Sequence, residues 1–261
     1  MRTKLYKILV LIFFSGLLNI FLTSCKENNI QIKKITGKQE EINLNFQSDS
    51  AYIDIILPYK IKLQDEINTI LCYNPRTLKR EEGDLESSLG NLYADICFQK
   101  ADSLFYKKTG KRIDFALFNY GGIRTEIPKG EISVKNIFEL MPFENKLVVA
   151  RLSADQVKSL FRYLEERKEP HPISHIKIKM NANKITGITI NNQAYDSLKS
   201  YFILTHDYLQ HGGDNMAFFK EPISLFNTEY KVRDAIIDHL SNLDTLHASL
   251  DGRFKITNQH E

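Results

Sequence analysis

Outside its first 24 residues the sequence lacks a surplus of charge of either sign. The whole chain has 35 Lys and Arg against 32 Asp and Glu, and its formal net charge of +3 comes from Arg2, Lys4 and Lys7. Non-specific binding of nucleic acid needs a basic surplus, because the protein must replace the counterions of the phosphates. We therefore expect no nucleic-acid partner, although the balance leaves room for a local basic site.

The sequence also lacks internal repeats, a Gly/Ser-rich linker and a large number of cysteines. With 43% hydrophobic and 26% charged residues, its composition is near the globular average, which excludes a disordered tail or a fibrous repeat. Cys72 and Cys97 could pair in an oxidising compartment. Each lies among apolar residues that we expect to be helical, where a buried free thiol is common, and we favour that interpretation.

Familiar catalytic motifs are absent as well. The chain contains no Gly-x-Ser-x-Gly, Cys–His or P-loop arrangement. Its seven histidines are scattered: His171 and His175 stand four apart across a proline, and His206 and His211 flank a loop. Hydrolysis with two metal ions needs a dense set of His, Asp and Asn ligands. We therefore expect surface or loop roles for the histidines, and neither a catalytic residue nor a metal ligand.

The N-terminus has the pattern of a secretory signal, with basic residues before an apolar run from Ile8 to Leu22. Leu22-Thr23-Ser24-Cys25 resembles a bacterial lipobox, in which Cys25 is acylated and becomes the new N-terminus. A membrane-spanning helix would need about 20 apolar residues, more than this run provides. We expect a lipoprotein of the bacterial cell envelope, held on the membrane by its acyl chains. By analogy Lys26 favours the outer membrane, and the periplasmic or surface face stays open.

Apolar periodicity predicts an α+β fold: a single domain with a mixed β-sheet flanked by helices. Residues 25–50 resemble a tether that enters an edge strand, with alternation at Ile42, Leu44 and Phe46, and the domain is expected over residues 51–261. The predicted helices cover Tyr59–Leu71, residues 88–108, residues 154–166 and Glu229–Leu243. The predicted strands cover Ile113–Phe118, Lys146–Arg151, Ile176–Met180, Ile185–Ile190 and Tyr201–Thr205. Ser87 or Ser88 can cap the second helix and Gly110 can end it.

A first polar cluster, Asn119-Tyr120-Gly121-Gly122-Ile123-Arg124, follows a predicted buried strand directly. Paired glycines after a strand permit a tight turn and close approach of the backbone to a ligand. Asn119 can donate and accept hydrogen bonds, and the fork of donors on Arg124 suits phosphate or carboxylate. Alone, the cluster is also compatible with an ordinary turn.

Two further clusters lie in predicted loops. Residues 140–145 contain Phe143 after a proline, which could cap the core, and residues 205–214 join a strand to a second Gly-Gly pair. In the latter, Tyr208 could be core packing and Asp214 a turn cap. Together, however, two loop aromatics can clamp a flat ring by stacking, and an acid can accept hydrogen bonds from sugar hydroxyls. With an arginine for phosphate, the three clusters predict a nucleotide or nucleoside site.

These motifs, in this order, resemble the C-terminal domain of the 5′-nucleotidase family, which includes bacterial UDP-sugar hydrolases and animal ecto-5′-nucleotidases. The resemblance rests on Asn-Tyr-Gly-Gly-Ile-Arg, then Gly130–Ser133, then Met-Pro-Phe-Glu-Asn and the Gly-Gly-Asp loop. Residues 86–95 are similar to the family's opening helix, and His171-Pro172-Ile173-Ser174 to its middle loop. The resemblance runs from about Tyr59 to Phe219.

The resemblance implies a substrate-binding role for matching residues of all three clusters. Phe143 and Tyr208 would form the two faces of a base sandwich, and Asp214 would accept hydrogen bonds from the ribose. Stacking on a base is worth about 1–3 kcal/mol per side chain. The implied substrate-binding residues are Asn119, Gly121, Gly122, Arg124, Phe143, Tyr208, Gly212, Gly213 and Asp214.

Two departures from the family pattern qualify these expectations. An arginine often precedes the family's Glu-x-x-x-Gly-Asn turn; here Leu85 stands at that position, and Arg80, five residues earlier, is the candidate to replace its charge. Full-length members also carry an N-terminal metallophosphatase domain, whose metal-binding motifs are not found in this sequence. We therefore expect no cofactor in this chain and divalent metals in a partner domain.

Three hypotheses follow. The first is the nucleotide-binding half of a split 5′-nucleotidase, a phosphoric ester hydrolase of nucleotide catabolism, completed by a separate metallophosphatase polypeptide. The binding half would position the phosphate for metals supplied in trans. The second is a non-catalytic lipoprotein that binds nucleosides or nucleotides. The third is a degenerate relative without a ligand that serves as a surface interaction module.

Overall fold

The computed structural model describes residues 6–7, 10–12, 32–41, 43, 49–181 and 183–257. Cys25 and the alternating Ile42, Leu44 and Phe46 lie outside these ranges, so the lipid anchor and the edge strand stay predictions. Residues Ile53–Glu261 cluster into one compact unit, which contains all three polar clusters. In the described part of the chain, no helix is both long enough and apolar enough to cross a bilayer.

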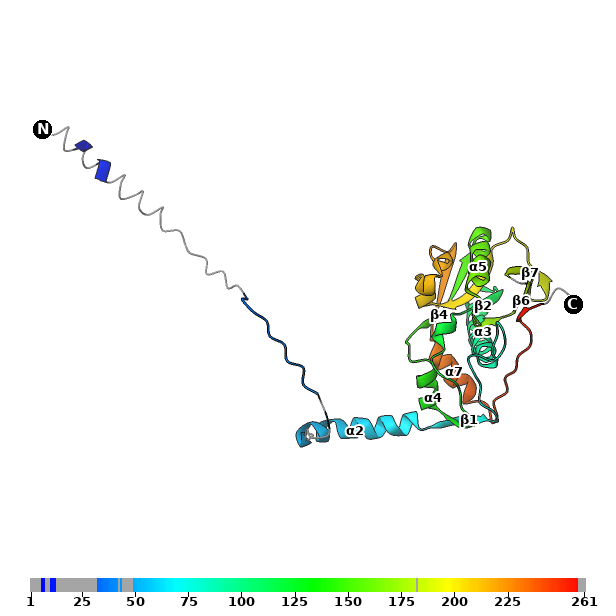
Figure 1. The fold of residues 1–261 in the computed structure, drawn as a ribbon, viewed down its shortest axis with the longest axis horizontal. Helices are drawn as coiled ribbons and strands as arrows, with labels where there is room; N and C mark the ends of the chain where they lie inside the picture. Colours follow the sequence, from blue (N-terminus) through cyan, green and yellow to red (C-terminus); the bar gives the residue numbers. More distant parts are fainter. Residues whose placement is uncertain are drawn as a thin grey trace. The chain divides into compact units, whose positions relative to one another are not determined.

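The elements after residue 49 alternate irregularly between helix and strand (Figure 1). The helices are α2 (Ser50–Ile67), α3 (Ser88–Thr109), α4 (Val134–Leu140), α5 (Ala154–Arg167), α6 (Asp207–Gln210) and α7 (Val232–Leu240), with 3₁₀ turns η1 (Tyr120–Gly122), η2 (Gly213–Asn215) and η3 (Ala217–Phe219). The strands are β1 (Ile70–Asn74), β2 (Phe115–Leu117), β3 (Gly130–Ser133), β4 (Lys146–Leu152), β5 (Ile173–Ser174), β6 (Ile176–Asn181), β7 (Lys184–Ile190), β8 (Gln193–Ala194), β9 (Tyr201–His206), β10 (Ser224–Lys231) and β11 (Phe254–Ile256).

The long helix α3 begins and ends where the sequence predicts. The side chain of Ser87 accepts a hydrogen bond from the backbone N–H of Gly90, which satisfies one of the free donors of the first turn. Gly110 follows the helix in the left-handed conformation (φ 70°), where a glycine costs least. The predicted helix over residues 88–108 is thus confirmed.

The central sheet has five strands in the order β10-β4-β9-β2-β5. Strands β2 and β9 run parallel, whereas β9–β4, β4–β10 and β2–β5 are antiparallel pairs. A four-stranded sheet (β11-β6-β7-β8) and the pair β1-β3 complete the β-structure of the described residues. The predicted α+β class, with a mixed sheet flanked by helices, is confirmed.

The central sheet is buried on both faces, and its side chains divide between two cores. In β2 and the residue after it, Ala116 and Phe118 pack with α3 and α7 on one face. Phe115 and Leu117 pack with α5 and the four-stranded sheet on the other. Because alternate residues of a strand point to opposite faces, both faces need apolar side chains. This explains the nearly uninterrupted apolar run that marks β2 in the sequence.

Two predicted helices are partly strand. Helix α2 ends at Ile67, and Ile70–Asn74 pairs with β3, so Cys72 lies in a strand rather than a helix. Likewise, residues before Val232 belong to β10, which pairs with β4, and the helix covers only Val232–Leu240. Short apolar runs fit either period, and pairing with a distant strand decides both cases. Cys72 and Cys97 are free and buried, as expected.

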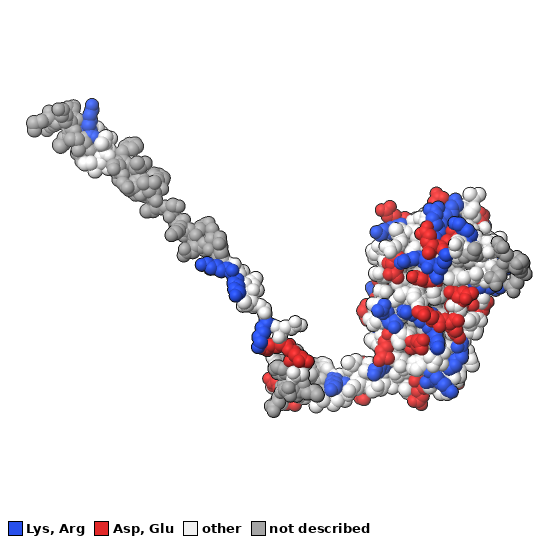
Figure 2. All heavy atoms as spheres, viewed as in Figure 1, with Lys and Arg blue, Asp and Glu red and all other residues white. Residues whose placement is uncertain are grey.

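Charged side chains of both signs are interspersed over the face of the compact unit that Figure 2 shows. The chain as a whole has 35 basic and 32 acidic residues. On this face the two signs are mixed as well, rather than separated into patches. Ion pairs of the compact unit include Arg112–Asp102 and Lys100–Asp238.

Candidate functional site

The three polar clusters meet at one edge of the central sheet, and the strand pairing explains why. Strands β2 and β9 are parallel, so the segments that follow them, Asn119–Gly122 and Asp207–Asn215, leave at the same edge. Strand β4 is antiparallel to β9, with Leu147 opposite His206, so the loop before β4 that carries Phe143 arrives at that edge too. The topology therefore brings together residues up to 95 positions apart, as in the contact between Asn119 and Asp214.

A pocket of about 300 Å³ opens between these loops. Phe143 is 39% exposed and Tyr208 47% exposed, so neither ring is part of the core. Seven of the nine predicted binding residues line the pocket. The lining consists of Asn119, Gly121, Gly122, Arg124, Phe143, Asn145, Tyr208 and Asp214.

Asp214 is held by two neutral donors. The amide Nδ2 of Asn119 donates to its Oδ2 at 2.5 Å, and the hydroxyl of Tyr208 to its Oδ1 at 3.2 Å. Its backbone carbonyl accepts from the hydroxyl of Tyr163 at 3.0 Å. Asp214 has φ 51°, a left-handed conformation that Asp tolerates better than most residues. These contacts fix a carboxylate at the pocket, and no ion pair joins it to a Lys or Arg among the described residues.

Two buried imidazoles lie behind the pocket, although surface or loop roles were predicted for the histidines. His171 is 2% and His206 0% exposed. The Nδ1 of His171 accepts the backbone N–H of Tyr120 at 3.1 Å, and the Nε2 of His206 lies 3.2 Å from Oδ1 of Asn119. Burial lowers the pKa of each imidazole to about 4, because a charged ring would lose its hydration. Both are neutral at pH 7 and hold the turn that follows β2.

Two glycines of the site leave room for neighbouring side chains. A Cβ at Gly213 would lie 2.4 Å from the ring of Tyr208, and one at Gly122 would lie 2.8 Å from Oδ1 of Asn119. Both positions therefore need glycine for the observed side-chain placement. Gly212, with φ 90°, turns the chain after α6. Gly212 and Gly213 shape the pocket without lining it.

The arginines of the site divide their roles. Arg124 lines the pocket, and its guanidinium donates to the carbonyl of Gly121 at 3.3 Å. Leu85 is buried in the core at 2% exposed. Arg80 does not line the pocket: its guanidinium lies 4.3 Å from the centre of the Tyr120 ring and donates to the carbonyl of Ile123. It therefore holds the Gly-Gly turn rather than replacing the missing charge.

Asn145 also lines the pocket, and the sequence reasoning did not select it. It stands two residues after Phe143 in the same loop, at the entry to β4. The signal in the sequence that could have identified Asn145 is its position as a polar residue near Phe143 of the predicted aromatic clamp. Its amide can donate and accept, which suits the polar edge of a flat ring.

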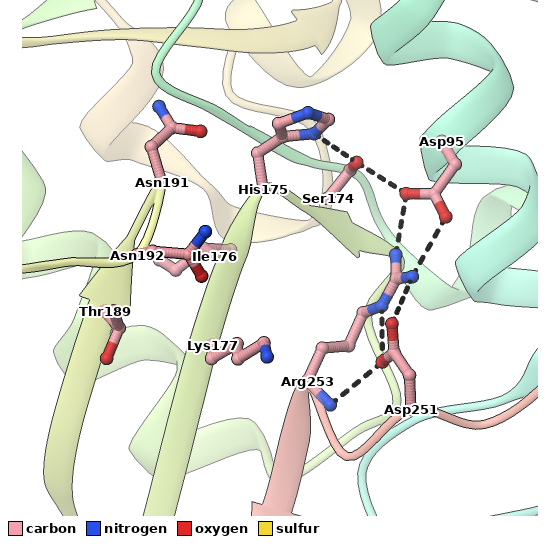
Figure 3. A pocket seen from close by; sticks show the side chains of 10 residues that line it. All are labelled: Asp95, Ser174, His175, Ile176, Lys177, Thr189, Asn191, Asn192, Asp251 and Arg253. Carbon is pink, nitrogen blue, oxygen red and sulfur yellow. Dashed lines mark hydrogen bonds and ion pairs between the residues drawn. The ribbon is translucent and has the colours of Figure 1, made fainter.

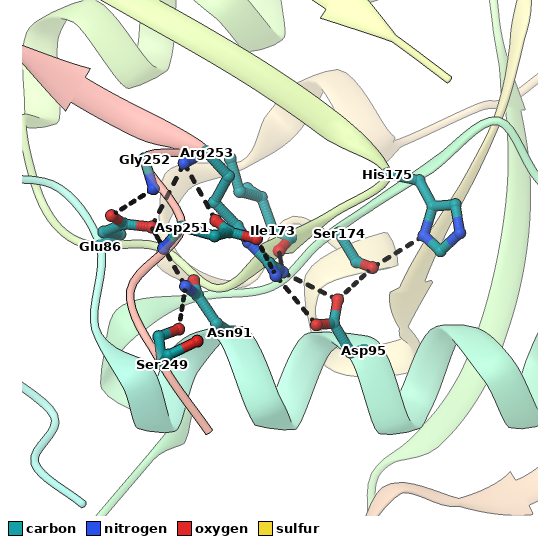
Figure 4. Close-up of polar contacts among 10 residues, drawn as sticks. All are labelled: Glu86, Asn91, Asp95, Ile173, Ser174, His175, Ser249, Asp251, Gly252 and Arg253. Atoms are coloured by element: carbon teal, nitrogen blue, oxygen red, sulfur yellow. Dashed lines mark hydrogen bonds and ion pairs between the residues drawn. The ribbon is translucent and has the colours of Figure 1, made fainter. Parts of the chain in front are cut away.

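A second hollow, of about 320 Å³, lies around His175 (Figure 3). One wall is an ion-pair network in which Arg253 lies between Asp95 and Asp251, with N–O distances of 2.8 Å. Glu86 accepts the backbone N–H of Gly252 at 2.8 Å, and Asn91 joins Glu86 to the carbonyl of Ser249 (Figure 4). These contacts fasten the segment before β11 to α3, so the polar groups of this wall have a structural use.

His175, at the rim of this hollow, has φ 62°. Its ring stacks on Phe98, and its Nδ1 lies 2.9 Å from the hydroxyl of Ser174, which donates to Asp95. Among the described residues, no group of three or more His, Cys, Asp and Glu is placed to hold a metal ion. The divalent metals that the resemblance implies therefore find no fitting site in the described part of the chain.

A family model and individual relatives of known name point to the same protein family. A family model described as the C-terminal domain of 5′-nucleotidase matches residues 63–221. Protein UshA of Escherichia coli is 28% identical over 230 residues, which cover 81% of this chain and 40% of that protein. A 5′-nucleotidase of Vibrio parahaemolyticus is 23% identical over 214 residues, which cover 78% of this chain and 35% of that protein. The chain thus spans less than half the length of these relatives.

The crystal structure of a 5′-nucleotidase precursor from Thermus thermophilus has a similar fold. It superimposes with a TM-score of 0.65 at 23% identity, covering 80% of this chain and 43% of that one. The two chains therefore share the fold over the covered residues.

Proposed function

Because the chain belongs to the 5′-nucleotidase C-terminal domain family, we propose that its pocket binds the base and ribose of a nucleotide. In this proposal a metallophosphatase unit on a separate chain supplies the metals and the attacking water. The observation that carries the proposal is the shared pocket of Phe143, Tyr208 and Asp214. Two exposed rings offer stacking faces for a base, and a carboxylate held by neutral donors offers acceptors for ribose hydroxyls.

Arg124 completes the proposed site with a positive charge. Its guanidinium lines the same pocket, and a planar fork of donors suits phosphate oxygens. Leu85 supplies no charge, so Arg124 is the proposed phosphate contact. We therefore expect AMP to bind more tightly than adenosine, and the Arg124→Met variant to remove that difference.

The binding role is tested by titrating AMP and adenosine against the purified protein by calorimetry. Asp214→Asn replaces an acceptor by an amide, and a hydrogen bond to a charged group is worth about 1.5–3 kcal/mol. We expect its affinity for adenosine to be about 10- to 150-fold lower. Asp155→Asn, at an exposed position in the first turn of α5, should bind like the wild type. A wild-type protein that binds neither ligand would refute the proposed function.

The separate catalytic chain is tested by pull-down from native membranes, followed by a nucleotidase assay of the eluate. We expect the purified chain alone, supplied with divalent metal, not to hydrolyse AMP, and the eluate to hydrolyse it. Hydrolysis by the chain alone would contradict the proposal that a separate chain supplies catalysis. Nucleotide binding without a co-purifying nucleotidase would favour the second hypothesis, a non-catalytic binding lipoprotein.

We also propose that Cys25 is acylated and holds the protein on the membrane of a bacterial envelope. The support is the sequence pattern alone, a basic start, an apolar run and Leu-Thr-Ser-Cys. Cys25→Ser should move the protein from the membrane fraction to the soluble fraction and abolish incorporation of labelled palmitate. Labelling that persists in this variant would refute the assignment.

A further inference from the structure

His206 makes one contact through each ring nitrogen and does not itself line the pocket. It is the last residue of β9 and the N-cap of α6, and it is fully buried. Its Nδ1 lies 3.4 Å from the backbone nitrogen of Leu209, and its Nε2 lies 3.2 Å from Oδ1 of Asn119. The ring therefore joins the cap of a helix to a residue of the pocket.

The chemistry of the partners fixes the direction of every hydrogen bond in this chain of contacts. The N–H of Leu209 can only donate, so Nδ1 of His206 accepts and the proton of the neutral ring is on Nε2. Nε2–H then donates to Oδ1 of Asn119. At the other end the carboxylate of Asp214 can only accept, so Nδ2 of Asn119 donates to it at 2.5 Å. A flipped Asn119 amide would set two donors against each other at His206 and two acceptors at Asp214.

The backbone is adapted to this arrangement. A Cβ at Gly122 would lie 2.8 Å from Oδ1 of Asn119, so glycine leaves the space that this oxygen occupies beside His206. With its Oδ2 engaged by Asn119, Asp214 has its Oδ1 toward Tyr208, whose hydroxyl donates at 3.2 Å. That contact is at the long end for a bond between two oxygens, so a hydroxyl of a ligand can displace it.

We propose that His206 is a positioning residue: through the amide of Asn119 it fixes the carboxylate of Asp214 for hydrogen bonds with ribose hydroxyls. The inference rests on the proposed nucleotide-binding function and deepens it. It predicts that the preference for ligands with ribose hydroxyls depends on a side chain that touches no ligand.

Two substitutions separate the two hydrogen bonds of the ring. In His206→Asn the amide oxygen stands near the place of Nδ1 and can still cap α6, but the side chain is too short to reach Asn119. In His206→Gln the amide nitrogen stands near the place of Nε2 and can still donate to Asn119. The probes are adenosine and 2′,3′-dideoxyadenosine, which lacks both ribose hydroxyls, titrated by calorimetry.

The wild type should prefer adenosine. His206→Asn should lose roughly tenfold in affinity for adenosine and little for the dideoxy compound, since a misaligned charged hydrogen bond loses much of its strength. His206→Gln should keep the preference. Equal weakening of both ligands in His206→Asn would mean a merely structural role and would overturn the inference. A wild type that binds neither compound would overturn the proposed function as well.

Nitrogen NMR of the wild type provides a test that does not depend on a variant's folding. The inference requires the His206 proton on Nε2 and an unprotonated Nδ1 at pH 7. A proton on Nδ1 would reverse the hydrogen bonds and overturn the inference, whatever the variants show.

Discussion

Two carboxylate clusters of this domain are built in opposite ways. In the closed cluster, Asp95 and Asp251 flank Arg253 at 2.8 Å (Figure 3). In the open cluster, the carboxylate oxygens of Asp214 accept hydrogen bonds from the neutral donors of Asn119 and Tyr208. A carboxylate paired with a guanidinium is largely neutralised, whereas one held by neutral donors keeps its charge for a further donor. Direct ion pairing with a guanidinium therefore distinguishes the carboxylates of the closed cluster from Asp214 in the open cluster.

The clusters also differ in what they connect. The closed cluster links α3 to the segment before β11, at a separation of 158 residues between Asp95 and Arg253. The open cluster links the loops after two parallel strands, and two neutral imidazoles support it from behind. The closed cluster should therefore matter for stability and the open cluster for binding.

Of the changes that test this comparison, acidification should have the largest effect, because it charges the two buried imidazoles that support the open cluster. The pKa of His171 and of His206 is lowered to about 4 by burial, against about 6.5 in the unfolded chain. Between these values the unfolded chain binds more protons, so stability falls as the pH falls from 6.5 to 4, by on the order of 3 kcal/mol per imidazole. Urea unfolding at pH 7 and at pH 4.5 measures the loss. His206→Gln should make the loss smaller, and an unfolding free energy that does not change with pH would contradict the account.

Arg253→Met should destabilise the fold without changing the affinity for adenosine. Removing one partner of a buried ion pair costs about 3–5 kcal/mol; since the two carboxylates are about half exposed, we expect about 2 kcal/mol. Arg112→Met is the matched control, because that guanidinium pairs with Asp102 while 61% exposed, and it should cost less than about 0.5 kcal/mol. Urea unfolding measures the stability of each variant, and titration with adenosine measures its affinity. Reduced affinity at unchanged stability in Arg253→Met would reverse the comparison between the two clusters.

Tyr208→Ala should do the opposite, lowering affinity for adenosine with little effect on stability. Loss of one stacking ring should cost about 1–3 kcal/mol, or about 5- to 150-fold in the dissociation constant, and Phe143→Ala should act similarly. Tyr106→Ala removes a ring of the same exposure, 48% against 47%, outside the pocket. Unchanged binding in both pocket variants, measured by calorimetry, would refute the clamp.

Gly213→Ala should have the smallest effect. The added Cβ would meet the Tyr208 ring at 2.4 Å and push it from its rotamer, at a cost of about 0.5–1.5 kcal/mol. We expect affinity for adenosine to fall by about two- to tenfold. Gly187→Ala, whose nearest neighbours are 3.9 Å away, is the control and should bind normally. Equal affinities of the two variants would show that the position of the ring does not matter.

The sequence was sufficient to predict seven of the eight residues that line the pocket. Asn119, Phe143, Tyr208 and Asp214 each follow or precede a strand whose apolar run is readable, and the ordered motifs resemble one family. The helix α3 was predictable from its period and from Ser87 and Gly110, since all its determinants are local.

The errors share a physical cause, because they concern contacts between residues far apart in the sequence. Strands β1 and β10 exist because β3 and β4 pair with them, which no local period reports. Burial of His206 depends on Asn119, 87 positions away, so a surface or loop role was the wrong expectation. The ion pairs of Arg253 likewise join distant segments, and no local pattern marks them.

A crystal structure of the protein with AMP would test the central claim most directly. The account predicts the adenine between the rings of Phe143 and Tyr208, with a ribose hydroxyl within hydrogen-bond distance of Asp214. Adenine bound beside His175, or anywhere away from those two rings, would contradict it.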